Sequence, residues 1–311
     1  MIAGEQTLEL GRLRTDINRR KIRDQIFVIV GLMILFAALL VLVLLFVDLV
    51  RDGASRLNLN FFTSFPSRNA ERAGILSAWV GTSLIMIVTA AIAVPVGVAS
   101  AIYLEEYAPR NVLTSIIEIN VTNLAGVPSI IYGLLALGLF VYQFQLGQSI
   151  ASAGLTLALL ILPIVIVATR ESLRAVPRAI REAAYALGAT RWEVTKDHVL
   201  PYSVGGILTG TIIGLSRAIG ETAPLITIGA LSFIAFLPQP PITGEFPFVS
   251  FGWLSDSFTA MPIQMFNWVS RPDPAFQHNA AAAGAILLGM TLLMNGVAIY
   301  VRYRFRKRIN W

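Results

Sequence analysis

The stretch Glu182-Ala183-Ala184-Tyr185-Ala186-Leu187-Gly188-Ala189-Thr190 is followed by His-Val-Leu-Pro at residues 198–201. Both lie in a charged segment between two long apolar runs. Pro177 directly precedes a predicted short amphipathic helix, whose expected apolar face consists of Ile180, Ala183, Ala184 and Leu187. Gly188 is well placed to end this helix, because glycine enters the left-handed conformation without steric cost. This charged segment is therefore predicted to be a surface docking loop rather than an active site.

A second helix is expected directly after Gly188. Thr190 and Glu193 have the spacing of a capping box, in which each side chain accepts a hydrogen bond from a free backbone N–H at a helix start. The sequence thus predicts two short helices at an angle, which form a compact rigid lever. An ordinary pair of helices on a membrane surface has a similar pattern, because amphipathic interfacial helices are common.

The composition is that of an integral membrane protein. Apolar residues make up 56% of the 311 residues, charged residues 14%, and the mean hydropathy is +0.70. Cysteine is absent, which excludes disulfides, a thiolate nucleophile and Cys-based metal sites. His198 and His278 have no ligand spacing around them and are expected on the surface, so we predict neither a metal nor a cofactor in this chain.

Six apolar runs are long enough to cross about 30 Å of hydrocarbon as helices. We therefore predict an all-α membrane protein with spans at 26–48, 76–104, 116–143, 153–170, 203–237 and 280–301. The first run exceeds the apolar core of a signal peptide, and no clear cleavage site follows it, which indicates an uncleaved helix.

Basic residues set the predicted orientation. An even number of spans places both termini on one side, and Lys and Arg cluster before the first span and after the sixth, so both termini should be cytoplasmic. The segments then assigned to the inside hold 18 of the 24 basic residues. Since these residues flank apolar runs instead of forming a soluble patch, the charge of +6 does not indicate a nucleic-acid partner.

This orientation gives a domain organisation. We expect a cytoplasmic N-terminal segment at 1–25, a first transmembrane helix at 26–48, a transport core at 76–302 and a basic cytoplasmic tail at 303–311. Within the core, the docking loop covers 171–202 and an extracytoplasmic segment covers 238–279. The latter is rich in Pro, Phe and Trp, which predicts an ordered cap that receives an external partner or an aromatic anchor at the headgroups.

The fifth span carries a charged pair at a depth where charge is costly. Arg217 follows Ser203 by 14 residues, or roughly 20 Å along a helix. Glu221 lies four residues further on, so the two side chains share a face and are expected to pair. A ridge of small residues beside them allows close helix contact: Gly206, Gly210, Gly214 and Ala218. Gly220 and Pro224 favour a local break in the helix.

Two interpretations of this pair stay open, a structural ion pair or part of a substrate route. The guanidinium of Arg217 matches tetrahedral oxyanions by bidentate donation, which favours an anion as the ligand. Arg170 is a weaker pathway candidate, since it also fits a snorkelling helix end. Asn123, Ser129 and Tyr132 are further candidates, although Gly126, Gly133 and Gly138 explain their segment equally well by helix packing.

Three segments resemble the A-type permeases of bacterial phosphate ABC importers, within the binding-protein-dependent ABC permease superfamily. They are residues 123–134 (NLAGVPSIIYGL), 178–201 and 217–225 (RAIGETAPL), and the resemblance covers roughly 75–302. Glu182, Ala183, Ala184, Gly188 and Ala189 match the Glu-Ala-Ala loop by which such permeases contact an ATPase. The first 25 residues and 238–279 carry no matching motif.

The resemblance implies a type I ABC importer permease core in the bacterial inner membrane that moves inorganic phosphate by alternating access. It implies a second related permease, two ATPase subunits that bind ATP and Mg²⁺, and an extracytoplasmic phosphate-binding protein. It also assigns Arg217, Glu221 and Thr222 to the translocation pathway. The chain itself lacks G-x-x-x-x-G-K-[ST] and is not expected to be an enzyme. Another oxyanion such as sulfate or molybdate, an ion-coupled secondary transporter and a membrane scaffold remain as alternatives.

Overall fold

The structure is a computed structural model that describes residues 2–242, 248 and 250–306. The chain divides into two compact units, Met1–Arg51 and Asp52–Trp311. Residues 307–311 of the predicted tail, and residues 243–247 and 249 of the predicted extracytoplasmic segment, lie outside the described residues.

The first unit is part of one long helix, α1 (Ile2–Gly53). The predicted N-terminal segment and first span are therefore not separate elements, because no proline interrupts the helix between them. Its most apolar window has a mean hydropathy of 3.3, the highest among the candidate spans.

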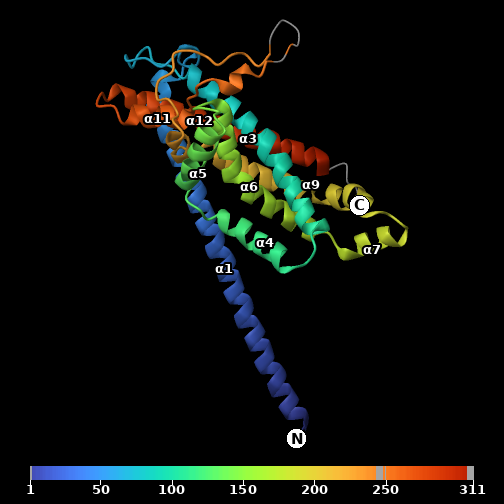
Figure 1. The fold of residues 1–311 in the computed structure, drawn as a ribbon. Coiled ribbons are helices and arrows are strands. Elements are labelled where there is room, and N and C mark those ends of the chain that lie inside the picture. Colours follow the sequence, from blue (N-terminus) through green and yellow to red (C-terminus); the bar gives the residue numbers. More distant parts are fainter. Residues whose placement is uncertain (1, 243–247, 249, 307–311) are drawn as a thin grey trace. The chain divides into compact units, whose positions relative to one another are not determined.

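Long helices form the core of the second unit (Figure 1). They are α3 (Leu76–Ile102), α6 (Ile150–Arg174), α9 (Leu200–Ile219) and α12 (Ala275–Arg306). α3 and α9 pack on α6, and α12 packs on α9. The predicted ridge of small residues on α9 is confirmed, since Gly206 abuts Ser172 and Gly210 abuts Ala168, both on α6.

Shorter elements connect and cap these helices. They are η1 (Ala54–Arg56), α2 (Leu59–Thr63), η2 (Tyr103–Tyr107), α4 (Val112–Leu124), α5 (Ser129–Ala136), η3 (Leu137–Gln143), α7 (Arg178–Ala186), α8 (Arg191–Glu193), η4 (Val194–Val199), α10 (Ala223–Thr227), η5 (Gly252–Ser255) and α11 (Met261–Val269). η2, η3 and η4 are π-helical, while η1 and η5 are 3₁₀ turns.

The predicted third span is not one straight helix. α4 and the helix Ser129–Gln143 meet at an angle of 109°. Pro128 lacks an N–H and disfavours the helical conformation of the residue before it, so the chain leaves the α4 helix before it. The Tyr132 hydroxyl donates a 2.7 Å hydrogen bond to the Leu124 carbonyl, which satisfies one free acceptor at the end of α4.

The predicted fifth span, 203–237, is wrong at both ends. The helix runs from Arg191 through α8, η4 and α9 to Ile219, and Gly220 follows as its C-cap. The short helix α10 begins only at Ala223, with Pro224 in its first turn. The described residues thus contain five helices able to cross a membrane, or six if the bent pair of α4 and Ser129–Gln143 is one span.

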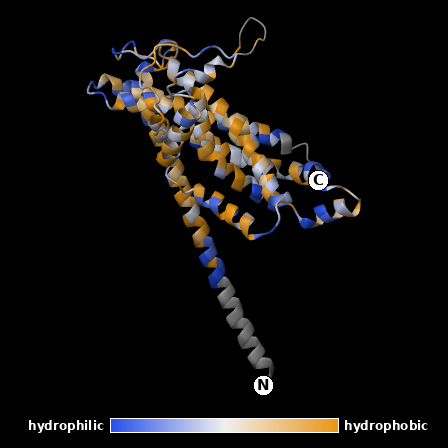
Figure 2. Cartoon of the chain, viewed as in Figure 1, coloured by the Kyte–Doolittle hydropathy of each residue, from blue (hydrophilic) through white to orange (hydrophobic). Residues whose placement is uncertain are grey.

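The two ends of the second unit carry different elements (Figure 1). α11 packs on α3 and α12, and α7 packs on η4 at the other end. The aromatic-anchor interpretation is wrong for Trp253 and Trp268, because both are buried, and Trp268 contacts Phe61 in a tilted arrangement with ring centroids 5.8 Å apart. Figure 2 shows hydrophobic residues along the long helices and a mixture of hydrophilic and hydrophobic residues on α7.

Candidate functional site

The Glu-Ala-Ala segment forms α7, and Gly188 ends it as the sequence predicts. Gly188 has φ +84°, in the left-handed region that favours glycine. Its N–H donates to the Tyr185 carbonyl at 2.9 Å, and the Ala189 N–H donates to the Ala184 carbonyl at 3.2 Å. These two bonds are the Schellman motif, which satisfies carbonyls at the helix end and fixes the turn into the next helix.

The predicted capping box is also present, at the start of α8. The Thr190 side chain accepts from the Glu193 N–H at 3.4 Å, and the Glu193 carboxylate accepts from the Thr190 N–H at 2.7 Å. The hydrogen bonds from Thr190 lower the pKa of the Glu193 carboxyl below its usual value near 4.5. The helix that begins here continues into α9, so the predicted second lever helix is not short: it is the polar first part of a longer helix whose later part is apolar enough to cross a membrane.

The apolar face predicted for α7 is only partly correct. Ala184 is buried and Ile180 half-buried against a small cluster that includes Leu173, Val176, Val194 and Val199. Ala183 is exposed, and Leu187 is 90% exposed, because this small cluster covers only one row of side chains on the nine-residue helix. We call the exposed residues Glu182, Ala183, Tyr185 and Leu187 the docking patch.

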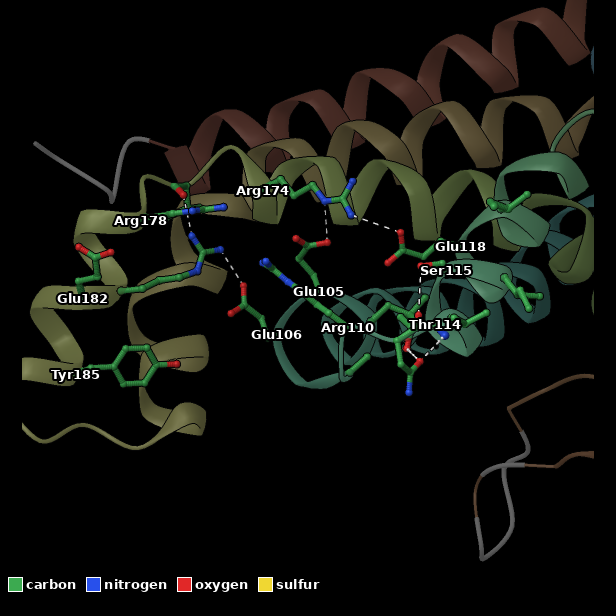
Figure 3. Close-up of a pocket in the computed structure, with 18 residues that line it drawn as sticks. Glu105, Glu106, Arg110, Thr114, Ser115, Glu118, Arg174, Arg178, Glu182 and Tyr185 are labelled. Atoms are coloured by element: carbon green, nitrogen blue, oxygen red, sulfur yellow. Dashed lines mark hydrogen bonds and ion pairs between the residues drawn. The ribbon is translucent and has the colours of Figure 1, made fainter.

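A network of ion pairs that sequence reasoning missed lies beside α7. It borders an open pocket of about 1300 Å³ between η2, α4, the end of α6 and α7 (Figure 3). Arg174 pairs with Glu105 at 2.8 Å, and Arg181 pairs with Glu106 at 2.8 Å. The signal in the sequence is the acidic pair Glu105-Glu106 after the second apolar run, but its partners lie 65 to 75 residues away.

Arg170 belongs to this network. Its guanidinium lies 2.6 Å from the Glu118 carboxylate and 3.5 Å from that of Glu105. The side chain is 6% exposed, so the snorkelling interpretation is wrong. Asn123 and Arg170 line one pocket of about 340 Å³ between α4 and α6, so the structure brings these two candidates together.

The predicted pairing of Arg217 and Glu221 is present, with Nε and Oε1 3.2 Å apart. Arg217 lies in the last turn of its helix instead of its middle, because α9 ends at Ile219. The two side chains are 39% and 17% exposed, so the guanidinium remains accessible. Thr222 follows the pair and precedes α10.

A second broken helix meets this one. α10 packs against α5, which begins at Ser129. The two helices approach closely at Gly133, where a Cβ would lie 2.7 Å from the Pro224 Cα and would overlap the Thr227 hydroxyl. The charged pair and its neighbour Thr222 thus lie where two interrupted helices meet, and Arg170 and Asn123 line a pocket whose other residues come from α4 and α6.

A family model described as "Binding-protein-dependent transport system inner membrane component" matches residues 93–310. This chain belongs to that family. Its relatives include the "Probable ABC transporter permease protein YqgI" of Bacillus subtilis (strain 168), which is 33% identical over 68% of this chain and 72% of that protein. The "Phosphate transport system permease protein PstA" of Yersinia pestis is 29% identical over 97% of both chains.

Solved structures of importers share the fold. The inward-facing MetNI methionine ABC transporter matches 74% of this chain and 95% of its own, with a TM-score of 0.58 at 14% identity. An amino acid ABC transporter matches 74% of this chain and 93% of its own, with a TM-score of 0.51 at 17% identity. The predicted fold class is confirmed: this is a multi-pass inner-membrane transport subunit with an ABC importer permease fold.

Proposed function

We propose that this chain is the membrane-spanning permease subunit of an ATP-driven importer that moves inorganic phosphate into the cytoplasm by alternating access. The observation that carries the proposal is the accessible Arg217 beside Glu221 at a helix break. The choice of phosphate is supported by the relatives named phosphate transport system permease proteins, one of which aligns over 97% of both chains.

The Arg217–Glu221 pair suits transient binding of an oxyanion. A guanidinium donates two parallel hydrogen bonds to a tetrahedral anion, which a lysine ammonium does not match geometrically. Glu221 holds Arg217 when no anion is bound, and its charge opposes tight retention of an anion. Thr222, Ser129, Asn123 and Arg170 are proposed as further pathway residues.

The energy of ATP hydrolysis by a partner subunit would be transmitted to this chain through α7. The docking patch presents an exposed carboxylate and exposed apolar side chains on a helix whose C-terminal end is fixed by a Schellman motif, shortly before the capping box that starts α8. We assign this patch to contact with a partner ATPase, which would bind ATP and Mg²⁺. The complex would contain two ATPase copies and a second, related permease.

The proposed orientation places α7 and both termini in the cytoplasm, since most basic residues flank the spans on that side. The end that carries α11 then faces outward. That end would receive the extracytoplasmic phosphate-binding protein.

An uptake assay tests the substrate. The chain is copurified with its candidate permease and ATPase partners, placed in vesicles, and supplied with ATP and the binding protein. Uptake of phosphate in preference to sulfate and molybdate supports the proposal. Preference for sulfate or molybdate would change the proposed substrate but leave the proposed ATP-driven mechanism in place. Uptake that needs an ion gradient and no ATPase would indicate a secondary transporter.

A further inference from the structure

Among the charged residues of α7, Arg181 is the one whose side chain contacts the rest of the described chain instead of lying in or beside the docking patch. Its guanidinium donates to the Glu106 carboxylate at 2.8 Å, to the Leu173 carbonyl at 2.8 Å and to the Val176 carbonyl at 2.7 Å. The Arg181 and Glu106 side chains are only 17% and 9% exposed. One side chain thus bonds to three separate positions in the chain.

These partners belong to two long helices. Leu173 lies in the last turn of α6 and Val176 just beyond it, where backbone carbonyls lack partners within the helix and a cation is favourable. Glu106 lies in η2, the π-helical continuation of α3. Arg181 therefore ties α7 to the ends of α6 and α3.

The connection continues beyond η2. Glu105, adjacent to Glu106, bonds to Arg174 at 2.8 Å, and Figure 3 shows the two side chains directed toward each other. Arg170 bridges Glu105 and Glu118, and Glu118 lies on α4. No residue of α4 is buried, so these ion pairs are prominent among its contacts with the rest of the described chain.

Arg181 differs from the other charged residues of α7 in being partly buried and in forming an ion pair. Arg178 and Glu182 are exposed, and neither forms an ion pair within the described part of the chain. Loss of a buried hydrogen bond between charged groups is more costly than loss of an exposed one. The contacts of Arg181 are therefore the polar connection through which a displacement of α7 would be carried to α3.

We propose that Arg181 is a positioning residue for coupling, which makes α7, the end of α6 and η2 move as one body and carries the movement of α7 to α3 and, through Glu105 and Arg170, to α4. This inference rests on the proposed function, in which α7 contacts an ATPase.

The first test measures the amount of substrate transported per ATP hydrolysed by the reconstituted complex. In Arg181→Gln and in Glu106→Gln we expect an assembled complex that still hydrolyses ATP, with this ratio lowered about tenfold, since one hydrogen bond between charged groups is worth about that factor. The ratio in the double variant should be no lower than in Arg181→Gln alone, because Arg181→Gln already removes the contact that Glu106→Gln removes. In Arg181→Lys, which keeps the positive charge, the amount of substrate transported per ATP should fall less than in Arg181→Gln. Arg304→Gln, which removes an exposed charge near the end of α12, is the control.

The second test does not depend on the substrate. Because the chain contains no cysteine, spin labels can be attached to Ala179→Cys on α7 and Tyr103→Cys on η2, both exposed. We expect one narrow distance distribution with and without ATP, and a broad one after Arg181→Gln. Narrow distributions in the variant, or a ratio that falls only in proportion to lost assembly, would overturn the inference. Lack of phosphate uptake by the unmodified complex would instead count against the proposed function.

Discussion

The Arg217 Nε lies 3.2 Å from the Glu221 Oε1, and the residue before Glu221, Gly220, caps the helix that carries Arg217. The same helix begins at Arg191, next to the capping box that follows the docking patch. At 1.5 Å per residue, Arg191 and Arg217 lie about 39 Å apart along this helix. The helix is thus a direct mechanical connection between the proposed ATPase contact and the proposed anion site.

Replacement of Arg217 tests the role of the charged pair. In Arg217→Ala we expect uptake to fall at least tenfold while the complex still assembles, because the accessible guanidinium is the proposed anion ligand. Arg217→Lys should restore only part of the uptake, since the ammonium keeps the charge without the bidentate geometry. Failure of Arg217→Ala to assemble would favour a structural ion pair.

Gly188 is expected to be intolerant of a side chain, although the space around it is open. Its φ of +84° makes Gly188→Ala cost about 1–2 kcal/mol and loosens the end of α7. We expect ATP-driven uptake to fall in Gly188→Ala while the chain still inserts in the membrane. Uptake should fall further in Gly188→Pro. The matched control is Gly205→Ala, which also meets open space but lies inside α9. Equal uptake by the Gly188 variants and the control would refute this prediction.

The capping box predicts that the stability of the helix start at Thr190 depends on pH only at acidic pH. Hydrogen bonds from Thr190 lower the pKa of the Glu193 carboxyl, so its ionised form stabilises the folded helix start. This stabilisation should be fully present above about pH 4.5 and be lost as the pH falls through the lowered pKa. Hydrogen exchange of the amides of residues 190–194 measures it. In Glu193→Gln the exchange rates, corrected for intrinsic pH dependence, should not show this transition.

The contact between α5 and α10 makes Gly133 a packing position. A methyl group there would approach the Pro224 Cα to 2.7 Å and overlap the Thr227 hydroxyl, so Gly133→Ala should destabilise the protein by about 1–3 kcal/mol. Gly138→Ala is the control, since a Cβ at Gly138 meets nothing within 4 Å. Thermal unfolding of the purified complex should show a lower Tm for the first variant only. A similar Tm for both would contradict the observed packing.

Features that depend on neighbouring residues were predictable from the sequence. The helix end at Gly188, the capping box of Thr190 and Glu193, and the pairing of Arg217 with Glu221 each involve residues within four positions of one another. The break after Arg217 followed from Gly220 and Pro224 for the same reason. The role of each as a site residue stays a prediction.

Features that depend on distant partners were not predictable. Leu187 shares a helical face with buried Ala184, but its exposure is set by the few side chains available to cover α7. Pro128 is a local signal for a break in the predicted third span, but the direction that α5 takes after it depends on packing against α10. Glu106 and Arg181 are separated by 75 residues, and no local pattern indicates which carboxylate a partly buried arginine will meet.

Phosphate import by this permease is tested most directly by ATP hydrolysis of the complete complex in liposomes, measured with and without phosphate and its binding protein. We expect stimulation by phosphate and no stimulation by sulfate, and loss of this stimulation in Arg217→Ala with the complex intact. A stable complex whose ATP hydrolysis responds equally to both anions, or not at all, would contradict the claim that this permease imports phosphate.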